Sequence, residues 1–317
     1  MRRVLVLLCA AAMLAAGCGR SEKKLKIGVS VPQATHSWAA GIISSAKQSK
    51  QAIEAANPDV EVIVAPGGNG AAQVSAIEQL MMQNIDALVV VCQEPEPLEN
   101  VCAEAKRRGI YLVIVSNPLP SGIQDVYVNG DNTSFGRAAA EAMGQALDGK
   151  GDILVMEGIL NPINTERVNG FREVLAAKYP DIRILDSQPS NWNPDQGLRL
   201  METYLQNYPK VDGVWAGDDD VLPNALKAYR ESGRNDVKAF IGGGGSKTVV
   251  KMIMDKDPLV KATVSYHPNM TAVGVNAALE GLRNGKVPPA GKKEIIIPSE
   301  VIDVSNAPAH YFPDSAY

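Results

Sequence analysis

Short apolar runs alternate along this chain with amphipathic segments of helical length. One run, Ala87 to Cys92, is apolar throughout, as expected of a strand that is buried on both faces. The segment 38–56 shows the other pattern, with apolar residues at roughly helical spacing. Because such alternation favours right-handed βαβ units, it predicts parallel sheets covered by helices. The alternations are too numerous for one open sheet, so we predict an α/β fold with two doubly wound parallel-sheet lobes.

The same pattern predicts where the elements lie. Strands are expected at 26–31, 60–65, 87–92, 111–115, 152–156, 182–185, 213–216, 237–241, 260–265 and 294–297. Helices are expected at 38–56, 71–83, 98–108, 133–147, 164–179, 195–207, 221–232, 247–254 and 270–284. Asp131 or Asn132 is the expected N-cap of the helix at 133–147, and 130–132 is the expected first crossing between the lobes.

The first eighteen residues have the pattern of an export signal. Arg2 and Arg3 precede an uncharged apolar run at 4–16, and small residues then lead to Cys18. The run is shorter than the about 20 residues that span a bilayer, so residues 1–17 are predicted to be a signal peptide. A cysteine at this place resembles the bacterial lipobox, which implies that Cys18 becomes the lipid-carrying first residue of the mature protein. An ordinary signal with an incidental cysteine is the alternative.

The whole chain has the composition of a globular protein, with 45% hydrophobic and 21% charged residues and a net charge of −4, which becomes −6 when Arg2 and Arg3 leave with the signal. No second long apolar run follows the signal, so we expect no membrane span. A mildly acidic chain without a basic tract is a poor nucleic-acid binder, so we expect no nucleic acid partner. The signal and the lipid place the expected site of action outside the cytoplasm, in the periplasm or at the outer face of the cell membrane.

Two cysteines remain beyond the signal and the lipid site. Cys92 ends a predicted strand and Cys102 lies in the helix that follows, so a disulfide is possible outside the cytoplasm. Two buried free thiols are the equal alternative. Neither cysteine has metal-site spacing to one of the three histidines, and we expect neither a metal nor a cofactor.

Polar and aromatic residues collect in the loops that follow the predicted strands, where doubly wound sheets bind ligands. These loops contain no arginine or lysine before Lys247. Carboxylates and amides bind hydroxyls, rings cover C–H faces, and an anionic ligand would call for a guanidinium. The loops therefore favour a small neutral sugar or polyol. The candidate ligand-binding residues are His36, Trp38, Asn117, Asn164, Thr165, Trp192, Asp218, Gly244 and Tyr266.

Several short motifs occur in a characteristic order over 26–298. They are Ile27 to Pro32, Ile85 to Val90, Asn169 to Phe171, Asp186 to Pro189, and Asp218-Asp219 followed by Ala225 to Ala228. In this order the chain resembles the periplasmic sugar-binding proteins of bacterial ABC importers, the group that contains the ribose-binding protein. The resemblance implies a type I periplasmic binding fold with three hinge crossings and a sugar held between the lobes. The implied N-terminal lobe is 26–130 plus 267–297, and the implied C-terminal lobe with its tail is 131–266 plus 298–317.

The resemblance also implies roles for single residues. His36 and Trp38 fall where the family has an Asn and a stacking aromatic residue, and Trp192 falls on a second stacking position. Asp218 falls where the family places a polar residue at the ligand. Tyr266 falls near a ligand-facing Gln at the second crossing.

Other positions depart from the ribose pattern. Asn117 stands where ribose binders have an Arg, and Asn164 and Thr165 occupy the stretch where another ligand Arg is expected. Gly243 and Gly244 replace an aromatic residue and a ligand Asp. The scaffold of the family is therefore expected here without its ribose-specific contacts.

Three aspartates follow the predicted strand that contains Trp215, which we expect in the core. One of them is expected to cap the next helix and Asp218 to face the ligand. The whole pattern predicts a lipid-anchored, monomeric solute-binding protein that is not an enzyme and has no catalytic residues. It would deliver a sugar or polyol to a membrane ABC permease. The alternatives are an autoinducer or sugar sensor, and an exported glycoside hydrolase, which would need two facing carboxylates or a nucleophile–base pair.

Overall fold

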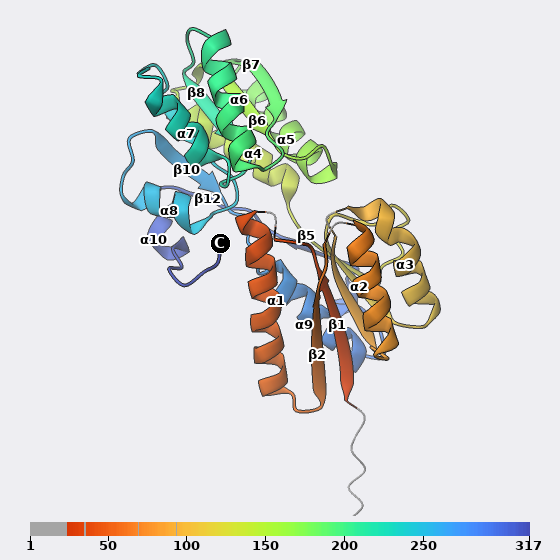
Figure 1. Cartoon of the computed structure of the whole chain (residues 1–317). Coiled ribbons are helices and arrows are strands. Elements are labelled where there is room, and N and C mark those ends of the chain that lie inside the picture. Colours follow the sequence, from red (N-terminus) through yellow and green to blue (C-terminus); the bar gives the residue numbers. More distant parts are fainter. Residues whose placement is uncertain (1–23, 35, 69, 93) are drawn as a thin grey trace, which may run out of the picture.

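Two α/β lobes lie end to end in the computed structural model, with the chain passing between them near the middle (Figure 1). The structure describes residues 24–34, 36–68, 70–92 and 94–317. The predicted signal peptide at 1–17 and Cys18 lie outside the described residues. The lobes confirm the predicted fold class, since each is built on a mostly parallel sheet flanked by helices.

The first lobe is built on a sheet with the strand order β11-β5-β4-β3-β1-β2, whose described pairs are parallel. Helices α1 and α9 pack on one face, and α2 and α3 pack on the other. Its elements are β1 (Leu25–Val31), α1 (Ser37–Ala56), β2 (Val60–Pro66), α2 (Gly70–Met82), β3 (Ala87–Cys92), α3 (Pro95–Arg107), β4 (Tyr111–Ser116), β5 (Val126–Gly130), α9 (Met270–Arg283), η1 (Pro289–Gly291) and β11 (Glu294–Ile297).

The second lobe repeats this plan with the strand order β12-β10-β9-β8-β6-β7, in which β12 runs antiparallel to β10. Helices α4 and α5 pack on one face, and α6, α7 and α8 pack on the other. Its elements are α4 (Asn132–Ala146), β6 (Lys150–Glu157), α5 (Pro162–Lys178), β7 (Asp181–Pro189), α6 (Pro194–Asn207), β8 (Gly213–Ala216), α7 (Leu222–Glu231), β9 (Ala239–Ile241), α8 (Lys247–Met254), β10 (Val260–Val264), β12 (Val301–Ile302) and α10 (Ala307–His310).

The chain passes from one sheet to the other at three places, after β5, after β10 and after β11. Asp131 caps α4 at the first crossing, because its carboxylate accepts from the backbone N–H of Ser134 at 2.9 Å. One apolar cluster continues across the lobes, from Ile27 through Phe135 to Tyr266. The lobe boundaries implied by the resemblance state which segments would move together as rigid units, and they remain a prediction.

The sequence pattern missed β5, β12 and α10. Strand β5 follows β4 without a helix between them, so it breaks the alternation on which the prediction rested. Cys92 lies at the end of β3 and Cys102 lies within α3. Both are buried, free thiols. Burial raises the pKa of the Cys102 thiol to about 12, so it stays protonated.

Helices α4 and α5 touch backbone to backbone through two glycines. A Cβ atom on Gly136 would lie 1.8 Å from the carbonyl oxygen of Arg167. A Cβ atom on Gly170 would lie 2.3 Å from the carbonyl oxygen of Thr133. Real Cβ atoms do not approach so closely, so only glycine permits this helix pair, which sets the position of Arg167 against α4.

Replacing Gly170 with alanine is therefore expected to destabilise the protein. Alanine favours a helix over glycine by about 1 kcal/mol, but the overpacked contact should outweigh this gain and lower the free energy of unfolding by about 1–3 kcal/mol. Urea denaturation measures the change. Ala177→Gly, on the exposed face of α5, is the control for helix propensity alone. A Gly170→Ala protein as stable as the wild type would show that α4 and α5 separate freely.

Candidate ligand-binding site

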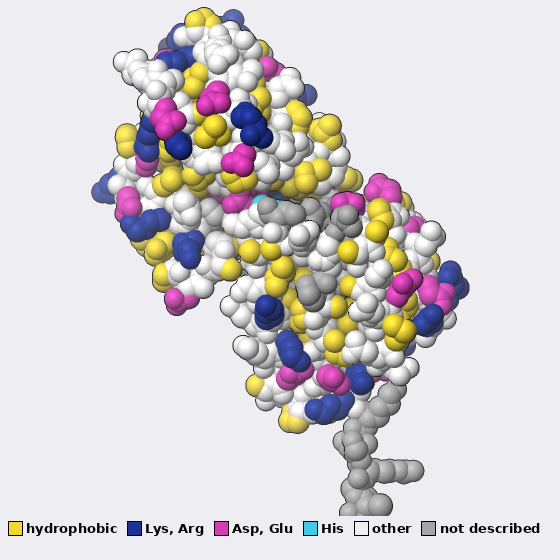
Figure 2. Space-filling model, in the orientation of Figure 1, with side chains coloured by type: hydrophobic (Ala, Val, Ile, Leu, Met, Phe, Trp, Pro, Cys, Tyr) yellow, Lys and Arg dark blue, Asp and Glu magenta, His cyan; other side chains and the backbone are white. Residues whose placement is uncertain are grey.

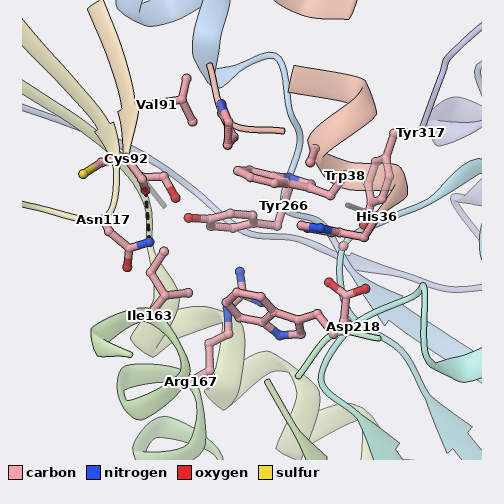
Figure 3. A pocket seen from close by; sticks show the side chains of 15 residues that line it. His36, Trp38, Val91, Cys92, Asn117, Ile163, Arg167, Asp218, Tyr266 and Tyr317 are labelled. Carbon is pink, nitrogen blue, oxygen red and sulfur yellow. Dashed lines mark hydrogen bonds between the residues drawn. The ribbon is translucent and has the colours of Figure 1, made fainter. Parts of the chain in front are cut away.

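Seen from outside, the two lobes meet at a waist (Figure 2). A cleft lies between the lobes, at the ends of strands from both sheets (Figure 3). The space between its walls measures about 560 Å³, which includes the part that is open to solvent at its mouth. Its lining residues come from both lobes, from the second crossing and from the last described residue. They are Pro32, His36, Trp38, Ala39, Val91, Cys92, Ser116, Asn117, Ile163, Arg167, Trp192, Asp218, Gly244, Tyr266 and Tyr317.

Aromatic rings form much of the wall (Figure 3). The ring of His36 stacks on that of Trp38 with centroids 6.2 Å apart, and the ring of Trp192 lies 6.5 Å from His36. The indole N–H of Trp38 donates to the carbonyl of Tyr266 at 3.0 Å, which fixes the Trp38 ring against the second crossing. Burial lowers the pKa of His36, against the opposing effect of Asp220. A neutral imidazole therefore faces the cleft near pH 7.

The loop after β7 holds Trp192 in an unusual conformation. Both Asn191 and Trp192 have a φ of 54°, in the left-handed region that costs energy for a bulky residue. The indole lies directly against Gly158, where a Cβ atom would be 2.0 Å from the Trp192 Nε1 atom. The strained backbone at Asn191 and Trp192, together with the absence of a side chain at Gly158, therefore places the indole ring in the cleft.

Arg167 is the lining residue that sequence reasoning missed. The residue is 5% exposed, and its guanidinium carbon lies 4.0 Å from the ring centre of Phe135 and 4.3 Å from that of Tyr266. Its Nε atom donates to the side-chain oxygen of Asn132 at 3.1 Å. Burial lowers the pKa of Arg167, although nearby Tyr266 and Asp218 oppose the effect, and an arginine with such neighbours stays charged.

The expectation of a cleft without positive charge is therefore wrong. The search covered the loops after the strands, whereas Arg167 lies on α5, one turn beyond the helix start at Pro162. It follows Ile163 by four residues, and residues at this spacing share one face of a helix. Helical periodicity applied to Ile163, which also lines the cleft, is the signal that would have found it.

The three aspartates after β8 have three different roles. Asp218 lines the cleft and is buried, and burial raises its pKa well above the ordinary value, with Asp220 adding to the effect. Asp219 holds the glycine loop, since it accepts from the N–H groups of Gly243 and Ser246 at 2.8 and 2.7 Å. Its burial raises its pKa to about 6 despite these bonds.

Asp220 caps a helix, but not the one expected. The N-cap of α7 is Val221, which makes no side-chain cap, so the prediction that an aspartate caps this helix is wrong. Instead, Asp220 reaches the other lobe and accepts from the backbone N–H and the hydroxyl of Ser37, at 2.9 and 2.5 Å. Ser37 is the first residue of α1, so an aspartate of one lobe caps a helix of the other.

Seven of the nine predicted residues line the cleft together: His36, Trp38, Asn117, Trp192, Asp218, Gly244 and Tyr266. The other two do not. Asn164 is buried behind the wall, where its side chain accepts from the N–H of Gly158 at 2.7 Å. Thr165 is exposed, and its hydroxyl donates to the carbonyl of Asn161 at 3.1 Å. The turn of α5 directs Ile163 and Arg167 into the cleft and these two residues elsewhere.

Trp215, expected in the core, is 1% exposed and stacks on Phe171 with ring centres 4.1 Å apart.

Among the described residues that line the cleft, Asp218 is the one with a carboxyl side chain. No group of three His, Cys, Asp or Glu side chains suited to a metal ion occurs among the described residues. None of the described helices has the length and apolar character needed to cross a membrane.

Comparisons with known proteins agree with this geometry. A family model described as a periplasmic binding protein domain matches residues 27–286. The xylitol-binding protein of Mycolicibacterium smegmatis is 34% identical over 167 residues, 52% of this chain and 48% of that protein. The ribose import binding protein of Bacillus subtilis is 26% identical over 268 residues, 84% of each chain. A solved solute-binding protein of an ABC transporter from Mycobacterium smegmatis, with bound glycerol, has a TM-score of 0.80 and 25% identity, covering 92% of this chain and 98% of that one.

The buried carboxyl of Asp218 predicts a dependence of stability on pH. Its pKa is raised on folding, so the folded state binds more protons, and the stability that it contributes at low pH is lost as the pH rises through the raised pKa. Asp218→Asn cannot ionise. We expect thermal unfolding of this variant to vary less than that of the wild type between pH 4 and 8, and the variant to be the more stable protein at the upper end.

The comparison isolates Asp218 because Asp219, which also has a raised pKa, is present in both proteins. Stability curves that run parallel over the whole pH range would show that Asp218 does not titrate differently in the folded state.

Proposed function

Because the chain belongs to the family of periplasmic binding protein domains, we propose that it captures a small neutral sugar or polyol in the cleft between its lobes. The observation that carries the proposal is the composition of the lining: flat rings from both lobes beside a buried acid and a buried guanidinium. Rings cover the C–H faces of a sugar, while Asp218 and Arg167 can bind its hydroxyls. The relatives named for xylitol and ribose support this ligand class.

Asp218 and Arg167 together suit the hydroxyl groups of a polyol. Burial raises the pKa of Asp218 well above its ordinary value, and a protonated carboxyl group can both donate and accept, while the guanidinium of Arg167 donates. A hydroxyl can accept from the guanidinium and can donate to or accept from the acid. Every unmatched polar group in the closed cleft costs about 1–3 kcal/mol, which would give selectivity among stereoisomers.

The proposed action is binding and delivery, with no bond made or broken. The lobes open and close about the three crossings, and the ligand stabilises the closed state because only there does it contact both lobes. The lobe edges around the cleft would then meet a membrane ABC permease. We propose that the protein is a monomer and not an enzyme. A sugar or autoinducer sensor would use the same cleft with a different partner.

Isothermal titration calorimetry with xylitol, D-ribose, D-glucose and glycerol tests the ligand class. We expect at least one of them to bind at micromolar concentration, and Trp192→Ala to weaken that binding roughly tenfold or more, a loss of about 1.4 kcal/mol or above. Thr165→Ala, on the exposed face of α5, should leave the affinity unchanged. Absence of binding by all four compounds would refute the proposed ligand class, and turnover of a chromogenic glycoside would instead favour the hydrolase.

We also propose that Cys18 carries a lipid that holds the protein at the membrane. In cells that process bacterial lipoproteins, the wild type should sediment with membranes. A Cys18→Ala protein should lose the anchor and appear in the soluble extracytoplasmic fraction or keep its signal peptide. Immunoblots of the separated fractions measure the distribution. Equal distribution and equal size of the two proteins would contradict the anchor.

A further inference from the structure

The segment 311–317, which follows α10, returns from the second lobe to the mouth of the cleft. In Figure 1 the chain ends between α8, α10 and the beginning of α1. This segment lies beyond the residues that match the family model, which end at 286. It also lies beyond the motifs on which the sequence-based site prediction was built.

Lys247 attaches the segment to the second lobe. Its ammonium group donates to the carbonyl of Pro313 at 3.0 Å and to that of Ser315 at 2.7 Å. The backbone N–H of Tyr317 then donates to the hydroxyl of Ser315 at 3.1 Å. These bonds fix the backbone just before Tyr317, so the direction of its side chain is determined by the second lobe.

The side chain of Tyr317 passes between the lobes and is held by two glycines. A Cβ atom on Gly41 of α1 would lie 2.9 Å from the Cβ atom of Tyr317. A Cβ atom on Gly244 of the second lobe would lie 1.7 Å from the phenol oxygen. Gly244 also has a φ of 130°, a conformation that other residues rarely adopt. Both lobes therefore leave space that this one ring fills.

The phenol hydroxyl of Tyr317 makes no hydrogen bond within the described part of the protein. The residue is 5% exposed, and buried hydroxyl groups nearly always have a hydrogen-bond partner. The group faces the cleft with His36 and Asp218 (Figure 3). Burial raises its pKa well above the ordinary value, and Asp218 adds to the effect, so the hydroxyl keeps its proton and can donate it.

We propose that Tyr317 is a ligand-binding residue whose hydroxyl hydrogen-bonds a hydroxyl group of the captured polyol beside Asp218. Lys247 is its positioning residue, because it holds the segment that presents the ring. The inference rests on the proposed function and adds a contact that the sequence-based set of site residues lacks. The competing possibility is that the ring occupies the place of the ligand and inhibits binding.

Tyr317→Phe separates these possibilities, because it removes one oxygen and keeps the ring. Without ligand, the variant should unfold at the same or a higher temperature than the wild type, since the lost hydroxyl had no protein partner. Titrated with the same four compounds, it should bind roughly five- to tenfold more weakly, as expected for one lost hydrogen bond. Phe312→Ala is the control, because this aromatic residue of the same segment is 57% exposed and should not alter either value.

Lys247→Met should weaken binding as much as or more than Tyr317→Phe, and Lys247→Arg should restore most of it, since a guanidinium can still donate to both carbonyl oxygens. Unchanged affinity in Tyr317→Phe, or tighter binding, would overturn the inference, the latter in favour of inhibition. A lower unfolding temperature without ligand would also overturn it, because the hydroxyl would then be in use within the protein. If the wild type binds none of the four compounds, the proposed function fails and the inference fails with it, whereas binding by the wild type with unchanged affinity in Tyr317→Phe overturns the inference alone.

Discussion

The cleft depends on the buried guanidinium of Arg167. A buried charge is costly unless other groups replace its water, and here the rings of Phe135 and Tyr266 cover its faces while Asn132 accepts from its Nε atom. Phe135 and Asn132 belong to α4, Arg167 belongs to α5, and Tyr266 lies at the second crossing. One cation therefore joins two helices of the second lobe to the segment that leads back to the first. The position of α5 and the path of that crossing are therefore fixed relative to each other.

Periodicity was sufficient to predict most of the fold. The strand at 87–92 occurs where the pattern placed it, because a strand covered on both faces must be apolar at every position. Strand β5 was missed because it follows β4 with no helix between them. The short β12 and α10 were missed as well, and they are held mainly by contacts with β10 and α8, which are distant in the sequence. Local pattern cannot show an element whose stability comes from distant partners.

The site was predictable to the extent that parallel strands end at a common edge. Loops after the strands brought Trp38, Trp192 and Asp218 to one cleft as expected. Arg167 was missed because it lies on a helix, outside the loops that were searched. Tyr317 was missed because its position depends on hydrogen bonds from Lys247 to carbonyl groups that lie 66 and 68 residues later in the chain. The prediction was wrong for Asn164 and Thr165. The resemblance indicated the correct segment of the chain, but the turn of the helix directs these two side chains away from the cleft.

The bond between Asp220 and the start of α1 has a consequence for how such a protein can evolve. This bond joins the lobes through two residues that are not themselves part of the cleft lining, so under the proposed motion it biases the balance between open and closed forms before any guest arrives. The apparent dissociation constant of each guest equals its intrinsic value divided by the fraction of molecules that are competent to bind. Loss of the Ser37 hydroxyl, which weakens this bond and leaves Asp220 in place, would then multiply every such constant by one common factor and leave their ratios untouched. Strength of capture and discrimination between guests are thereby encoded at separate positions, and natural selection can adjust one without disturbing the other.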